Sequence, residues 1–199
     1  MKSSVYNALV NSQLTYAITV WGGNATGDRL KPLFTLQKRA LRNLYGLRRV
    51  SKHVKAHTKP IFKENNILTV YNLYNYMTIL EIGKLKYNYT PKYLCNILKI
   101  HENPIRNKYG NRLFLPKFNC NHYQNNFCYQ APKLWNLLDS SQSYCNNVTN
   151  FSNILFLKKK IKSFLLDMQS YHDEINWHSA NYRISTYLAA VKNDPQFSM

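Results

Sequence analysis

The sequence predicts a mainly α-helical protein with one small β-ribbon or irregular insertion around residues 104–130. The helices are indicated by segments 30–49 and 152–168, where apolar residues recur at three- and four-residue spacing. Drawn as a helix, each segment carries an apolar stripe roughly 100° wide, which is the width of a core-facing surface. The insertion is indicated by the extended run RLFLPKF and by the turn-forming residues around it.

The first predicted helix covers residues 3–20, with Ser3 or Ser4 at its start. The side chains expected on its buried face are Val5, Leu9, Tyr16, Ala17 and Val20. The Trp-Gly-Gly sequence at 21–23 is expected to end this helix. Because a core-like helix follows Met1 almost at once, we expect a chain cut from a longer one, with the packing partner of this helix missing.

The second predicted helix, 30–49, has an apolar arc beside a cationic arc. Thr26 or Asp28 is expected to cap its N-terminus, and Pro32 is placed in its first turn, where a missing N–H costs little. Gly46 follows the last periodic residue, where a left-handed C-cap is expected. The apolar arc contains Leu30, Leu33, Phe34, Gln37, Leu41 and Leu44. The cationic arc contains Lys31, Lys38, Arg39 and Arg42, and Arg48 and Arg49 follow it.

The middle of the chain is expected to add further helices after a basic linker, 48–60. A short element ends in KPIFKENN, and Thr69 is expected to cap a helix that runs to about Lys86. The apolar face of that helix is predicted to contain Val70, Leu73, Tyr74, Met77 and Leu80. Pro91 is expected to open another short helix. A buried Gln37 would need hydrogen-bond partners in such a core.

Two more helices are predicted toward the C-terminus. The first is expected to start at Ala131-Pro132, with Trp135 as its core anchor, and a polar loop follows at 139–150. Ser152 or Asn153 is expected to open the second. Its apolar arc contains Ile154, Leu157, Ile161, Phe164, Leu165 and Met168. Its other side carries Lys158, Lys159, Lys160 and Lys162.

The charge of the chain points to an anionic partner. Its 27 Lys and Arg residues against 9 Asp and Glu residues give a formal net charge of +18. Such an excess indicates nucleic acid or an anionic membrane surface and says nothing about the fold. No apolar run is long enough for a membrane span, so we expect no stable membrane insertion. The four cysteines form no CxxC pair and no signal peptide is evident, which predicts reduced thiols and an intracellular protein, cytoplasmic or nuclear.

No residue pattern predicts a metal site or a bound cofactor. His53 and His57 are four residues apart but lack a third ligand, and a surface pair is the simpler interpretation. The set Cys120, His122 and Cys128 matches no standard zinc spacing. The sequence also has no nucleophile–base arrangement and no glycine-rich phosphate loop.

Six segments together, in this order, resemble one protein family. TYAITVWGG followed by LKPLFTLQKRALRNLYGL is similar to the stretch after the palm in reverse transcriptases of non-LTR retrotransposons of the LINE-like, jockey and CR1 types. Further matches are KPIFKENNILTVYNLYNY, IRNKYGNRLFLPKF, FCYQAPKLWNLLDSS and NFSNILFLKKKIKSFLLD. The resemblance implies a thumb-like helical region at 1–100, a C-terminal segment at 101–169 with a short β-ribbon and a basic amphipathic helix, and a variable tail at 170–199.

The chain departs from this family at the catalytic centre. The family holds two Mg²⁺ ions for nucleotide addition with paired aspartates in a Tyr-x-Asp-Asp turn. This chain has no Asp-Asp pair, and its aspartates, Asp28, Asp139, Asp167, Asp173 and Asp194, are scattered. We therefore expect this chain to be a fragment of an RNA-directed DNA polymerase that has no enzyme activity by itself. A need for Mg²⁺ is expected only in the full-length polymerase. The missing palm and fingers are an expected partner.

The charge and the resemblance together predict nucleic-acid binding, to RNA, DNA or a hybrid duplex. The predicted phosphate contacts are Lys31, Lys38, Arg39, Arg42, Arg48 and Arg49, with Arg106, Lys108 and Arg112 in a loop where Tyr109 can stack on a base. One alternative is a basic amphipathic module that binds a membrane surface or another protein. Another is a mobile-element fragment without function. For the run from Lys158 to Lys162, an ordinary solvated face is the simpler interpretation. For the loop with Arg106, Lys108 and Arg112, an exposed turn and a binding loop are equal alternatives, whereas the resemblance favours binding for the basic arc of 30–49.

Overall fold

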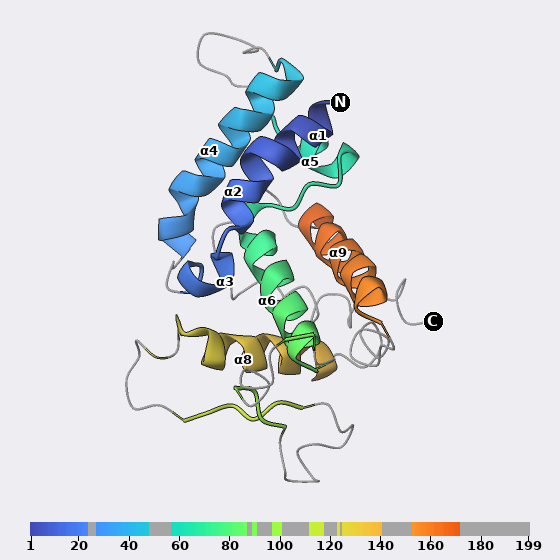
Figure 1. The fold of residues 1–199 in the computed structure, drawn as a ribbon. Coiled ribbons are helices and arrows are strands. Elements are labelled where there is room, and N and C mark those ends of the chain that lie inside the picture. Colours follow the sequence, from blue (N-terminus) through green and yellow to red (C-terminus); the bar gives the residue numbers. More distant parts are fainter. Residues whose placement is uncertain are drawn as a thin grey trace.

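Helix α6 (Val70–Lys86) is the central element of this computed structural model (Figure 1). Its first eleven residues, VYNLYNYMTIL, carry no charge, and a helix that is apolar on all sides is usually buried on all sides. It contacts α2, α3, α4, α8 and α9. The predicted bounds and the predicted buried face are confirmed, except that Met77 is only half-buried. The predicted face was too narrow, because Tyr71, Ile79 and Ile82 are buried as well.

The structure describes residues 1–23, 27–47, 57–86, 89–90, 97–100, 112–117, 123, 125–140 and 153–171. In this part of the chain the regular elements are helices, so the prediction of a mainly α-helical protein is confirmed. The short helix predicted from Pro91, the greater part of the polar loop at 139–150 and almost all of the tail at 170–199 lie outside the described residues.

The N-terminal segment forms several short helices instead of the single predicted one. Helix α1 (Lys2–Tyr6) continues into the π-helix η1 (Asn7–Asn11) and then into α2 (Ser12–Thr15). The helical conformation is interrupted at Ala17, which has a left-handed φ of 49°, and a further helix, α3 (Ile18–Trp21), follows. As predicted, the last of these helices ends where the two glycines begin.

The predicted buried face of this segment was wrong by one residue position. Leu9 and Val20 are 68% and 73% exposed, and Val5 and Tyr16 are exposed too. Tyr6 and Ile18 are buried in their place, with Val10, Leu14 and Trp21 packed against the core. Both faces repeat at four-residue spacing, so periodicity alone does not separate them. The tertiary contacts of Tyr6 and Ile18 decide which one is buried.

Helix α4 (Gly27–Tyr45) confirms its predicted apolar stripe. Leu30, Phe34, Gln37 and Leu41 are at most 1% exposed. Gly46 has a φ of +68°, and the Leu47 N–H donates to the Arg42 carbonyl at 3.0 Å, which is the bond pattern of a Schellman C-cap.

The N-terminus of α4 differs from its prediction. The helix starts at Gly27, so Asp28 lies inside it and cannot be its cap, and Thr26 lies outside the described residues. Pro32 therefore falls in the second turn and not in the first. At that position its missing N–H removes one bond of the helix ladder.

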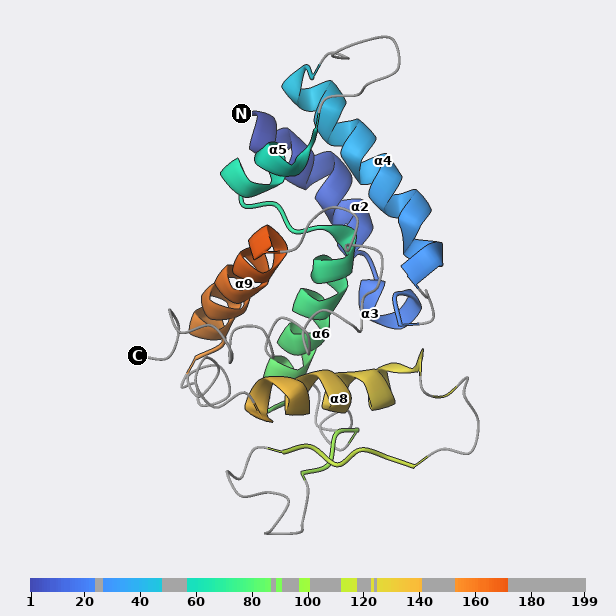
Figure 2. The same ribbon diagram turned by 180° about the vertical axis from the view of Figure 1, so that it is seen from behind.

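The remaining helices surround α6. Helix α5 (Lys59–Glu64) precedes it, α8 (Phe127–Ser140) crosses its C-terminal end, and α9 (Ile154–Tyr171) packs along it on the side away from α4 (Figures 1 and 2). Gly83 permits this packing, because a Cβ added there would overlap the Leu157 side chain.

The predicted start of α9 is confirmed, whereas that of α8 was wrong. The Asn153 carboxamide oxygen accepts the Leu155 N–H at 3.0 Å, as an N-cap does. Leu157, Ile161 and Leu165 of the predicted apolar arc are at most 1% exposed. Helix α8 begins at Phe127 and holds Pro132 in its interior, whereas Trp135 is buried as predicted.

The β-ribbon predicted around 104–130 is not confirmed, because the described residues contain no strand and most of 104–122 lies outside them. An isolated antiparallel bridge joins Ile100 to Leu113. The Phe114 N–H donates to the Lys99 carbonyl at 2.7 Å. The Asn136 carboxamide of α8 holds this segment, because it accepts the Leu113 N–H at 2.9 Å and donates to the Leu113 carbonyl at 2.8 Å.

Two buried glutamines hold residues 67–70, the extended segment that enters α6. Gln37 of α4 donates to the Leu68 carbonyl at 2.9 Å and accepts the Val70 N–H at 3.0 Å. Gln169 of α9 donates to the Ile67 carbonyl at 3.0 Å and accepts the Thr69 N–H at 3.0 Å. The two carboxamides thus satisfy backbone groups that are buried away from water. The expected need of Gln37 for partners is confirmed.

Gln37 also donates to the Tyr6 hydroxyl, at 2.7 Å, and so joins α1 to α4. Burial raises the pKa of Tyr6 from 10.0 to about 12, and the Gln37 hydrogen bond offsets part of that rise. Between these two pH values the unfolded chain loses the Tyr6 proton and the folded chain keeps it. The contribution of Tyr6 to stability is therefore complete below pH 10 and is lost as the pH rises to about 12.

We expect wild-type protein to lose about 2–3 kcal/mol more stability than the Tyr6→Phe variant across this alkaline range. At neutral pH the variant should be the less stable of the two, because the buried Gln37 amide loses a partner. Denaturant unfolding at several alkaline pH values measures the free energy of unfolding of both proteins. Equal pH dependence of their unfolding free energies would contradict the assignment to Tyr6.

Candidate nucleic-acid interface

The basic side of α4 is the candidate interface. The apolar stripe seats this helix on α1 and α6 and leaves a neighbouring side toward solvent (Figure 1). On that side Lys31 and Arg39 are exposed, and Lys38 and Arg42 are half-buried. The structure thus brings together the four predicted basic residues of α4 that lie in its described part.

The charged groups of Lys31 and Arg39 are available to a ligand. In the part of the chain that the structure describes, no carboxylate lies within ion-pairing distance of either side chain. The two residues are eight positions apart on α4, which is about two helical turns or roughly 12 Å along the axis. At this spacing, two long cationic side chains can each contact a different phosphate of one nucleic-acid molecule.

Lys38 is tied to the core and is less free than the other two. Its Nζ atom lies 4.4 Å from the centre of the Phe34 ring. The ring of Phe34 is in turn packed against those of Phe62 and Tyr71, with centroid separations of 6.1 and 5.5 Å. A cation is attracted to the face of an aromatic ring, and this contact holds the Lys38 ammonium group beside the core.

The other predicted contact residues do not extend this surface in the described structure. Arg48, Arg49, Arg106 and Lys108 lie outside the described residues. Arg112 is half-buried beside the Ile100–Leu113 bridge. In Figures 1 and 2 its segment, 112–117, lies beyond α8, away from α4. Arg112 is therefore separate from the basic side of α4.

The chain matches no family model, and no curated protein or solved structure is significantly similar to it. The resemblance to reverse transcriptases of non-LTR retrotransposons stays a prediction.

Few of the histidine and cysteine residues considered as metal ligands lie in the described part of the chain. His57 is exposed and Cys128 is half-buried, whereas His53, Cys120 and His122 lie outside the described part, as does Cys145. Within that part no three potential metal ligands gather. None of the described helices combines the length and the apolar character of a membrane span.

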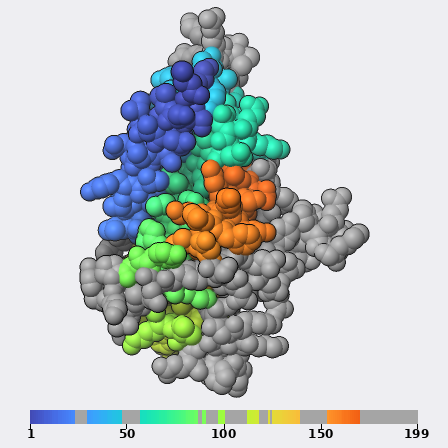
Figure 3. All heavy atoms as spheres, turned by 45° about the vertical axis from the view of Figure 1, so that its right-hand side comes forward, coloured from blue at the N-terminus to red at the C-terminus, as the bar shows by residue number. Residues whose placement is uncertain are grey.

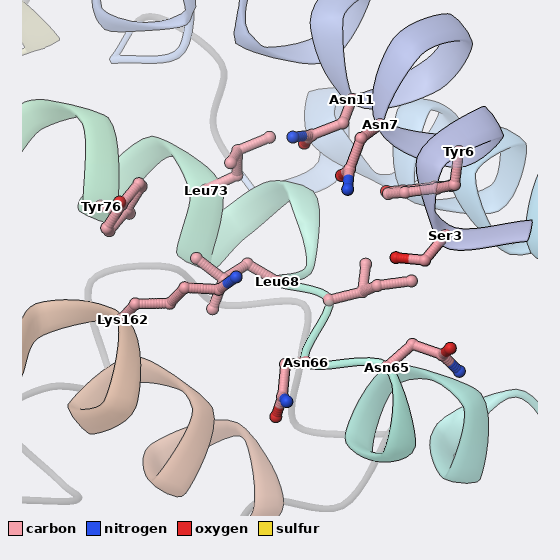
Figure 4. A pocket seen from close by; sticks show the side chains of 11 residues that line it. Ser3, Tyr6, Asn7, Asn11, Asn65, Asn66, Leu68, Leu73, Tyr76 and Lys162 are labelled. Carbon is pink, nitrogen blue, oxygen red and sulfur yellow. The ribbon is translucent and has the colours of Figure 1, made fainter. Parts of the chain in front are cut away.

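Sequence reasoning missed a pocket of about 250 Å³ between η1, the turn before α6, and α9 (Figures 3 and 4). Its walls include Asn7, Asn11, Asn66 and Lys162. Asparagine is abundant throughout this chain, and these residues come from three separate segments, so no local signal marks them.

Proposed function

We propose that this chain binds nucleic acid, without sequence preference, through the basic side of α4. The observation that supports the proposal best is the pair of exposed cations, Lys31 and Arg39, which have no ion-pair partner among the described residues and lie on a helix whose neighbouring side is fixed in the core. Lys38 and Arg42 flank them, and the net charge of +18 favours approach of any polyanion.

Such a surface gives affinity without reading sequence. Lys and Arg side chains that contact phosphates release condensed counterions, so binding weakens steeply as the salt concentration rises. Contacts to phosphate oxygens fix the position of a strand on the protein and carry no sequence information. A duplex or a structured RNA fits this chemistry equally well.

The resemblance refines the proposal to a thumb-like remnant of a retrotransposon reverse transcriptase that lacks the catalytic palm. On this proposal the chain holds a template–primer duplex and catalyses nothing by itself. The exposed apolar side chains of α1–α3, among them Leu9 and Val20, supply a surface for the palm or fingers of a polymerase.

Titration of a short fluorescent duplex at several salt concentrations tests the proposal. We expect the logarithm of the association constant to fall linearly with the logarithm of salt concentration, with a slope of about −3 or steeper. A slope near zero, or no binding at low salt, would contradict the proposal.

A second candidate function is binding to an anionic membrane surface through α9. Leu155 and Phe156 are 60% and 48% exposed, next to the exposed Lys158 and Lys159. Apolar and basic side chains on one helix are typical of interfacial binding. Flotation with anionic and neutral liposomes separates the two functions, since recovery with anionic lipid and no duplex binding favours this one.

A further inference from the structure

The pocket beside η1 is lined mainly by groups that form hydrogen bonds. Asn7 and Asn11 project from η1, and Lys162 extends from α9 toward them (Figure 4). Leu68 supplies apolar surface, and the half-buried ring of Tyr76 forms part of the wall. Lys162 is the only charged residue among those that line the pocket. A ligand with hydrogen-bonding edges and one negative group would match this lining.

Several of these groups have unused hydrogen-bonding capacity. Asn65, at the edge of the pocket, is already occupied, because its carboxamide accepts from Tyr45 at 2.6 Å and donates to the Ile61 carbonyl at 3.0 Å. Within the described part of the chain the carboxamides of Asn7, Asn11 and Asn66 make no such bonds. Each amide can both donate and accept, as the edge of a nucleobase does.

A backbone irregularity lies at this pocket. The π-helix Asn7–Asn11 supplies two of its amides, and π-helical turns are rare and occur often at functional sites. Asn66, on the other wall, has a left-handed φ of 51° because it is the C′ residue of the Schellman cap of α5, in which the Ile67 N–H donates to the Phe62 carbonyl at 2.9 Å. The π-helical turn is thus a further reason to regard the pocket as a binding site, whereas the backbone of Asn66 is explained by the end of α5.

We propose that this pocket binds one nucleobase, with the attached phosphate at the Lys162 ammonium group. The volume of about 250 Å³ is below the usual range for drug-sized ligands, roughly 300–1,000 Å³, and so suits a single nucleobase. The ring of Tyr76 provides an aromatic surface for the base. This inference rests on the proposed function, since the base would belong to an unpaired nucleotide of the bound strand.

Titration with adenosine 5′-monophosphate and with adenosine, followed by NMR of the side-chain amides, tests the pocket directly. Wild-type protein should bind the monophosphate more tightly than the nucleoside. The Lys162→Met variant should lose this preference, whereas Lys159→Met should keep it, because Lys159 is exposed on the same helix and does not line the pocket. Equal binding of both ligands by wild-type protein would overturn the phosphate assignment.

The Asn11→Leu variant tests the amide wall. We expect it to bind the monophosphate about tenfold more weakly, which corresponds to one lost hydrogen bond. Gln13→Leu is the matched control, because Gln13 is exposed on α2 and lies outside the pocket. Circular dichroism during heating confirms that each variant is folded.

The failures of the two proposals are distinguishable. If duplex binds with a steep salt slope while no monophosphate binds, the pocket proposal is overturned and the function proposed for α4 stands. If monophosphate binds in an Asn11-dependent way while duplex does not bind, the pocket proposal is supported and the function proposed for α4 is removed.

Discussion

Replacing Gln37 with leucine is expected to lower the free energy of unfolding by about 3–5 kcal/mol, because each unsatisfied buried group costs about 1–3 kcal/mol. Gln37 is 1% exposed and has partners in both α1 and the segment that enters α6. Leucine is close to glutamine in size, so the loss comes from hydrogen bonding and not from a large cavity. The Leu68 carbonyl and the Val70 N–H would both be left buried without this partner.

Thermal and urea unfolding measure this effect. For a protein of this length the expected loss corresponds to a fall in Tm of roughly 10 °C. The control is Gln13→Leu, the same substitution at an exposed site, for which we expect a change within about 0.5 kcal/mol. A Gln37→Leu variant as stable as this control would mean that Gln37 does not hold α1, α4 and α6 together.

The elements that were predicted correctly from the sequence are those that depend on residues close together in the chain. The apolar stripe of α4, the C-cap at Gly46 and the N-cap at Asn153 each follow from a few neighbouring residues, and the structure confirms all three. The face of α1–α3 was not predictable in this way, because two apolar faces of equal period lie side by side. The bond between Tyr6 and Gln37, 31 residues apart, favours one of them.

The two candidate sites also differ in whether they depend on neighbouring residues or on residues that are distant in the sequence. The basic side of α4 is visible in a helix projection, since the charges and the buried stripe belong to one segment. The pocket depends on Asn11, Asn66 and Lys162, which come together only when η1, the turn before α6 and α9 are packed. The amides of Gln37 and Gln169 likewise gain their role from backbone groups far away in the chain.

Removing the four described charges of α4 is expected to have the largest effect on binding. The variant replaces Lys31, Lys38, Arg39 and Arg42 with alanine, a residue that favours helix formation. Each phosphate contact contributes about 0.9 to the salt slope on B-form duplex and about 0.7 on a single strand. If all four residues contact phosphates, the slope should become less steep by about 3–4 units on duplex.

Loss of net charge alone must be separated from loss of this surface. The control variant replaces four exposed lysines of α8 and α9, namely Lys133, Lys158, Lys159 and Lys160, with alanine. It removes the same charge and leaves α4 unchanged. General electrostatic attraction to a polyanion would affect both variants to a similar degree.

The most direct test of the proposal that α4 binds nucleic acid is the salt dependence of duplex binding, measured for these two variants and for wild-type protein. We predict that the α4 variant loses about 3 units of slope and most of its affinity at low salt, while the control stays close to wild-type protein. Slopes that fall equally in both variants, or that fall only in the control, would contradict the assignment of the interface to α4.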